Sequence, residues 1–130
     1  LVSVEVHDWS LDNLAAVASR CAMAIVPVDL ENPYTSGKPE NRLRIHWRLG
    51  LPVLASDTPA HRRAMSVAGI TDDVLCRTDA DWSRCLERYV FDEEVRLLHA
   101  SAGREAVLGQ YSDEVMLDRW DQVLRTVGER

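Results

Sequence analysis

The chain has 130 residues, of which 46% are hydrophobic and 28% are charged, and its formal net charge at pH 7 is -6. These values fit one soluble globular domain. No apolar run approaches the roughly 18 residues of a membrane-spanning helix, and no signal-peptide pattern opens the sequence. We therefore expect a cytoplasmic protein, and we leave open whether it attaches to the inner membrane surface.

The cysteines and histidines show no pattern that builds a covalent or metal-bound framework. Cys21, Cys76 and Cys85 are odd in number and lack Cys-x-x-Cys spacing. That pattern argues against a disulfide scaffold and against a structural zinc site. The histidine spacings match no metal motif either. We predict reduced, buried cysteines, no metal and no other cofactor.

Positive charge is concentrated between residues 38 and 63, where six basic residues accompany two acidic ones in an otherwise acidic chain. A nucleic-acid-binding domain would be basic overall, with aromatic residues among the basic ones, and this chain has neither property. The local charge favours a small anionic ligand. The alternative is a solvated helix face.

The first third of the chain predicts a strand, a helix and a strand. Apolar residues alternate over residues 2–6 as in a strand, and Ser10 has the chemistry of a helix N-cap. The continuous apolar run at residues 22–28 is typical of a buried parallel strand. Because the first strand starts at once and no methionine precedes it, we expect residues 1–130 to be a single partial domain, truncated at its N-terminal side.

The middle of the chain repeats the alternation. Residues 29–37 are rich in loop-forming residues, and Pro39 suits the first position of a helix that stops at Gly50. Residues 51–56 then predict another short buried strand. A further helix is expected from Pro59 to Gly69.

The last third adds a strand at residues 72–78 and three helices. Thr78 and Asp81 have the spacing of a capping box, which also explains the Asp-x-Asp sequence there better than metal binding does. Helices are expected to follow residue 92 and Ser112. Strands that alternate with helices at these lengths predict an α/β fold with a doubly wound, mainly parallel, Rossmann-like sheet.

One predicted helix start combines several groups that bind anions. In parallel sheets, ligands bind beyond the carboxyl ends of the strands, near helix N-termini. Lys38, Asn41 and Arg42 add side-chain donors to the unpaired N–H groups of such a terminus, which is typical of phosphate binding. An ordinary proline-started helix with solvated basic residues is the alternative.

The stretch KPENRLRIHWRLGLPVLASDTPAHRRAM, residues 38–65, resembles the donor-binding region of glycosyltransferases with the GT-B fold. That region has the pattern K-x-x-N-[KR]-L, followed by A-x-G-[LI]-P-V-[VI]-A-[ST]. Residues 8–30 and 80–120 are similar to the flanking parts of the same domain. The resemblance implies the C-terminal domain of a group 1-like enzyme that transfers a sugar from a nucleoside-diphosphate sugar to an acceptor, without a cofactor.

The resemblance also implies partners and site residues. Lys38 and Arg42 would neutralise the donor diphosphate. The other donor-binding residues that it implies are Trp9, Ser36, Gly37, Asn41, Ser56, Asp57 and Thr58. The catalytic residues are unknown, and an N-terminal acceptor domain of the same protein would complete the enzyme. The chain alone is then expected to be inactive and to self-associate through an open sheet edge.

Other residues receive a structural interpretation. Arg44 and Arg48 are assigned to the surface, either solvated or facing the absent partner domain. His61 is assigned to the surface, with a place facing the donor as the alternative, and Trp47 is assigned to packing. Ile45 stands where many relatives carry a ribose-binding glutamate. This difference supports the alternative function, a non-catalytic, degenerate Rossmann-like nucleotide-binding or protein-interaction module. A receiver domain is a weaker alternative, because Asp8 stands almost alone where an acidic cluster would be needed.

Overall fold

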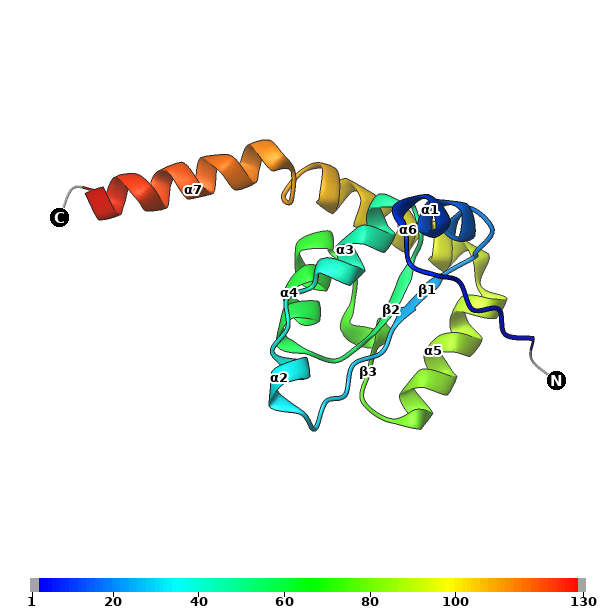
Figure 1. The fold of residues 1–130 in the computed structure, drawn as a ribbon. Coiled ribbons are helices and arrows are strands. Elements are labelled where there is room, and N and C mark those ends of the chain that lie inside the picture. The colour runs from blue at the N-terminus through cyan, green and yellow to red at the C-terminus, as the bar shows by residue number, and fades with distance from the viewer. Residues whose placement is uncertain (1–2, 129–130) are drawn as a thin grey trace.

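The computed structural model describes residues 3–128, with three parallel strands at its centre in the order β1–β2–β3 (Figure 1). The strands are β1 (Ala24–Val26), β2 (Val53–Ser56) and β3 (Leu75–Cys76). Ala24 pairs with Val53, and Ala55 pairs with Leu75. The fold is therefore α/β, with a small parallel sheet and a large share of helix.

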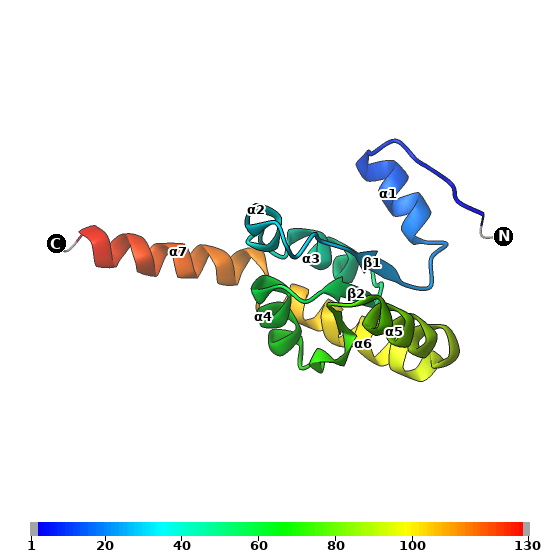
Figure 2. The ribbon, with the colours of Figure 1, turned by 90° about the horizontal axis from the view of Figure 1, so that it is seen from below.

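Helices surround the sheet and connect its strands. They are α1 (Leu11–Ala18), α2 (Pro33–Ser36), α3 (Asn41–Arg48), α4 (Pro59–Ala68), α5 (Asp79–Phe91), α6 (Glu93–Leu108) and α7 (Asp113–Gly128), with a 3-10 turn, η1 (Asp72–Val74), before β3. In both ribbon views α3 and α4 lie on one side of the strands and α5 on the other (Figures 1 and 2). Because the strands are parallel, their carboxyl ends and the starts of α3, α4 and α5 share one edge.

Local caps set most helix boundaries. Ser10, Thr58 and Thr78 each accept a hydrogen bond from the backbone N–H three residues later. Gly50 and Gly69 follow α3 and α4 with positive φ angles of 80° and 67°, a conformation that glycine adopts without strain. The predicted caps at Ser10 and Thr78 and the predicted stops at Gly50 and Gly69 are confirmed.

The core lies between α3, the sheet and α6. Leu43, Trp47, Leu54, Met65 and Tyr89 are fully buried. Burying a large apolar side chain of this kind stabilises the fold by about 3 kcal/mol. The predicted packing role of Trp47 is thus confirmed.

Gly103 on α6 lets that helix approach α3 closely. A Cβ atom added at Gly103 would lie only 2.4 Å from Cδ1 of Trp47. No side chain larger than hydrogen fits there without a shift of the indole ring. The sequence therefore needs its glycine at this contact for packing, since the backbone angle there is helical.

Three predicted features are wrong. Residues 3–10 contain no strand, and Val4 and Val6 are exposed because no other segment pairs with them; residue 2 lies outside the described residues. α3 starts at Asn41 instead of Pro39, and residues 33–36 of the expected loop form a separate short helix, α2. Cys21 is exposed, because the turn after α1 lies at the surface.

The other two cysteines are buried and unpaired, as predicted. Burial raises the pKa of the Cys76 thiol, which keeps this sulfur in its unreactive form at neutral pH. Within residues 3–128, no helix combines the length and the apolar character that crossing a membrane requires.

Candidate functional site

A cleft of about 180 Å³ opens where β1 and β2 end. Its apolar floor is Val26 and Val28, and its polar walls are given by Thr35, Lys38, Asn41, Arg42, Thr58 and His61. We call this hollow the strand-end cleft. It brings together four of the predicted site residues, namely Lys38, Asn41, Arg42 and Thr58.

The start of α3 supplies backbone donors to the cleft. Glu40 precedes the helix and makes no side-chain cap, so no acceptor within residues 3–128 takes the N–H groups of Asn41, Arg42 and Leu43. Asn41 and Arg42 line the cleft, so two backbone donors and the positive end of a helix dipole stand beside the side chains of Lys38 and Arg42, whereas Leu43 is fully buried. This is the arrangement that holds an oxyanion.

Lys38 is positioned by an aromatic neighbour. Its Nζ atom lies 4.8 Å from the centre of the Tyr34 ring, which is the geometry of a cation–π contact. Tyr34 belongs to α2, the short helix that the sequence did not predict. The turn that places this lysine is thus ordered by its own cap, in which Asn32 accepts from the N–H of Tyr34 at 3.0 Å.

Ser36 and Gly37 hold the short helix α2 together, whereas the resemblance implies that they bind the donor. Their N–H groups donate within α2, to the carbonyls of Asn32 and Pro33, at 3.0 and 3.1 Å. Neither residue lines the strand-end cleft. The backbone donors that remain open to the cleft lie at residues 41 and 42, because the helix begins later than the sequence indicates.

Ser56 ties two strands together below the cleft. Its buried hydroxyl accepts from the N–H of Val28 at 2.7 Å and donates to the carbonyl of the same residue at 3.1 Å. Both hydrogen-bonding capacities of the side chain are thereby used. The residue fixes where β1 ends and does not line the strand-end cleft.

The buried carboxylate of Asp57 pairs with two exposed arginines at the same edge. Its carboxylate receives two hydrogen bonds from Arg62, both at 2.5 Å, and one from Nε of Arg77 at 2.7 Å. The Arg62 guanidinium, helped by Arg77, lowers the pKa of this carboxyl although burial opposes the shift. Asp57 therefore stays ionised and joins the start of α4 to the end of β3.

Trp9 is 79% exposed in the segment before α1 and does not line the strand-end cleft. Thr58, by contrast, lines the cleft while its hydroxyl caps α4. The predicted residues thus divide into a group at the cleft and a group that supports or lies outside it.

His61 is a cleft residue that the sequence prediction assigned to the surface. Its side chain is buried, with 4% of the residue exposed, because it shares a helix face with Ala64 and Met65. Nδ1 lies 2.7 Å from the carbonyl oxygen of Ser56, and since a carbonyl only accepts, Nδ1 carries the proton. Apolar residues three and four positions later were the signal for burial.

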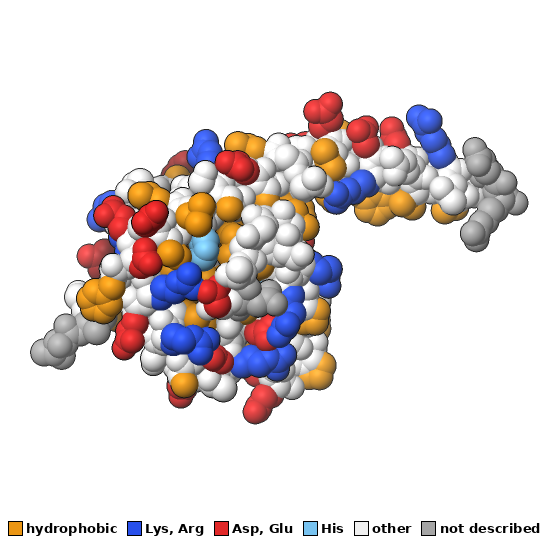
Figure 3. Space-filling view, turned by 180° about the vertical axis from the view of Figure 1, so that it is seen from behind, with side chains coloured by type: hydrophobic (Ala, Val, Ile, Leu, Met, Phe, Trp, Pro, Cys, Tyr) orange, Lys and Arg blue, Asp and Glu red, His pale blue; other side chains and the backbone are white. Residues whose placement is uncertain are grey.

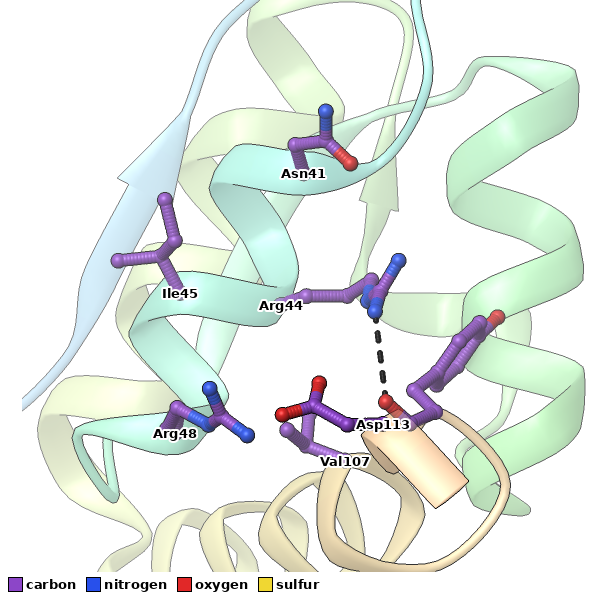
Figure 4. Close-up of a pocket in the computed structure, with 7 residues that line it drawn as sticks. Asn41, Arg44, Ile45, Arg48, Val107 and Asp113 are labelled. Carbon is purple, nitrogen blue, oxygen red and sulfur yellow. Dashed lines mark hydrogen bonds between the residues drawn. The ribbon is translucent and has the colours of Figure 1, made fainter. Parts of the chain in front are cut away.

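A second hollow, of about 330 Å³, runs along the outer side of α3 (Figure 4). It is lined by Asn41, Arg44, Ile45, Arg48, Val107, Tyr111 and Asp113. We call it the α3–α7 pocket, because it lies between α3 and the segment that leads into α7. Asn41 lines both hollows, so the two adjoin at the start of α3.

Arg44 is held against this segment, contrary to the prediction that it is solvated. Its guanidinium carbon lies 4.4 Å from the centre of the Tyr111 ring, and its Nη2 donates to the Tyr111 carbonyl at 3.5 Å (Figure 4). Burial raises the pKa of the Tyr111 hydroxyl, which stays protonated at neutral pH. Arg44 thus forms an anchored wall of the pocket.

Among the side chains that the structure describes, no group of three histidine, cysteine or acidic residues could hold a metal ion. No protein-family model, curated protein or solved structure matches this chain.

Proposed function

We propose that the chain is the donor-binding domain of a glycosyltransferase and that it binds a nucleoside-diphosphate sugar. The observation that carries the proposal is the convergence of Lys38, Arg42 and the acceptor-free N–H groups of Asn41 and Arg42 on one cleft at the ends of parallel strands. Two positive side chains and a helix N-terminus suit a diphosphate, which carries two negative charges.

The fold and the sequence pattern support the same proposal. Helices on both sides of a parallel sheet (Figure 2) suit a doubly wound, Rossmann-like domain. The strand-end cleft lies at the sheet edge where such domains bind ligands. The resemblance of residues 38–65 to GT-B donor-binding regions points to nucleotide sugars among the possible anions. An N-terminal domain of the same protein would then bring the acceptor.

The chemistry of this cleft is electrostatic. When the bond between sugar and diphosphate breaks, negative charge grows on the leaving phosphate. Lys38, Arg42 and the N–H groups of residues 41 and 42 would stabilise that charge without the need to reorganise. The residues of this chain thus promote departure of the nucleotide, and a catalytic base, where one is used, would come from the acceptor domain.

The test measures binding of ADP, GDP, UDP and CDP, and of matching nucleotide sugars, to the 130-residue chain by calorimetry. Lys38→Ala and Arg42→Ala should each weaken binding about 10- to 100-fold, the scale of a charge-assisted phosphate contact. Arg20→Ala removes an exposed arginine just after α1 and should leave affinity unchanged. Absence of binding by every nucleotide would overturn the proposal.

A protein-interaction module is the second candidate, and α7 favours it. Leu117, Trp120, Leu124 and Val127 lie on one side of this helix and are 60–67% exposed. Figure 3 shows the apolar side chains along one edge of the projecting helix. If the chain binds no nucleotide, this function becomes the leading one.

A further inference from the structure

The α3–α7 pocket offers opposite charges to one ligand. Arg48 on α3 and Asp113 at the start of α7 both line it, and Figure 4 shows their charged groups facing the same space. Neither side chain has a hydrogen bond or ion pair with another described residue, so both are available to a ligand. A ligand with hydrogen-bond acceptors alone would bind Arg48 and leave the carboxylate of Asp113 without a hydrogen-bond donor.

The size and place of this pocket suit one end of a nucleotide. Its volume of about 330 Å³ is near the lower limit of small-molecule sites, roughly 300 Å³. It meets the strand-end cleft at Asn41. A diphosphate held in the cleft would therefore direct its nucleoside into the α3–α7 pocket.

The polar groups of the pocket discriminate among bases. Guanine carries two adjacent acceptors, N7 and O6, followed by two adjacent donors, N1–H and the 2-amino group. A guanidinium complements the acceptor pair, and a carboxylate complements the donor pair. Adenine, cytosine and uracil have no such pair of adjacent donors, because an acceptor stands next to each of their donor groups.

We infer that the α3–α7 pocket recognises guanine, so that the donor is a guanosine-diphosphate sugar; this inference rests on the proposed function. Asp113 accepts from N1–H and the 2-amino group, and Arg48 donates to O6 and N7. Ile45 and Val107 supply apolar contact with the base. Arg44, anchored on Tyr111, closes the wall between base and phosphates.

The first experiment compares nucleoside diphosphates that differ only in the base. GDP should bind the chain at least 10-fold more tightly than ADP, UDP or CDP, the discrimination of one well-formed bidentate pair. Inosine diphosphate lacks the 2-amino group and should bind several-fold more weakly than GDP. Arg48→Ala should reduce the affinities for GDP and inosine diphosphate by the same factor.

The second experiment changes the acceptor on the protein. Asp113→Asn should weaken GDP binding at least 10-fold and strengthen binding of xanthosine diphosphate, whose 2-oxo group accepts from the new amide. A gain for one ligand cannot come from damage to the fold. Asp118→Asn, which alters an exposed carboxylate on α7 outside the pocket lining, is the matched control and should change neither affinity.

The outcomes separate the two claims. Equal binding of all nucleoside diphosphates, with no change of preference in Asp113→Asn, overturns guanine recognition and leaves the diphosphate site standing. A preference for the diphosphate of uridine or adenosine likewise overturns guanine recognition and leaves the diphosphate site standing. Absence of any nucleotide binding overturns both.

Discussion

Helices α3 and α7 each carry a tryptophan on an apolar face, but their surroundings are opposite. Trp47 on α3 is fully buried, whereas Trp120 on α7 is 60% exposed. α3 packs against β1, β2 and α6, and no residue of α7 is buried. An amphipathic pattern therefore indicates which face of a helix must be covered, while the covering residues come from another part of the chain.

The largest expected effect tests this difference directly. Trp47→Ala should reduce the free energy of unfolding by about 3–5 kcal/mol, because it leaves a cavity between α3 and α6. Trp120→Ala should change it by less than about 0.5 kcal/mol, since its ring faces water. Urea unfolding followed by circular dichroism measures both. Equal losses would show that α7 is packed in solution.

A smaller effect concerns two carboxylates, that of Asp57 in the packed body and that of Asp121 on the projecting helix α7. The pKa of Asp57 is lowered chiefly by Arg62, so its contribution to stability is present above the unfolded value of about 3.9 and is lost as the pH falls through the lower, folded value. Asp57→Asn should cost about 2 kcal/mol at pH 7 and flatten the fall in stability below about pH 4.

The control for that change is Asp121→Asn on α7, where the side chain is exposed. Thermal unfolding measured from pH 7 down to pH 3 compares the two variants. An unchanged acid profile in Asp57→Asn would mean that other carboxyl groups cause the acid sensitivity.

The smallest expected effect comes from helix caps. Thr78→Ala removes the capping box of α5 and should cost about 1 kcal/mol in global stability. Ser112→Ala removes the hydroxyl that accepts from the N–H of Val115 in α7. Because α7 is not packed on the body, fraying there should not change the urea midpoint. An equal loss of global stability in both variants would show that α7 unfolds together with the body.

Much of the fold could be predicted because its signals are local. The apolar runs at residues 22–28 and 51–56 contain β1 and β2, and the caps at Ser10, Thr58 and Thr78 depend on residues only three positions away. The strand expected at residues 2–6 fails for the opposite reason. Alternating valines have the right pattern, but a strand needs a partner, and within the described residues none pairs with this segment.

The candidate site could likewise be predicted only where its residues are close together in the sequence. Lys38, Asn41 and Arg42 lie within five positions, so their convergence could be predicted. Arg44 could not be placed, because its partner Tyr111 lies 67 positions away in the sequence. The α3–α7 pocket, which depends on that long-range contact, has no local sequence signal at all.

The projection of α7 also sets the shape of the molecule in solution (Figure 1). A compact chain of this length has a radius of gyration of about 14 Å. The 16 residues of α7 add a rod of about 24 Å that leaves the body at one end. X-ray scattering from the chain should therefore give a larger radius and a distance distribution with a long tail, and any partner that folds α7 back would shorten that tail.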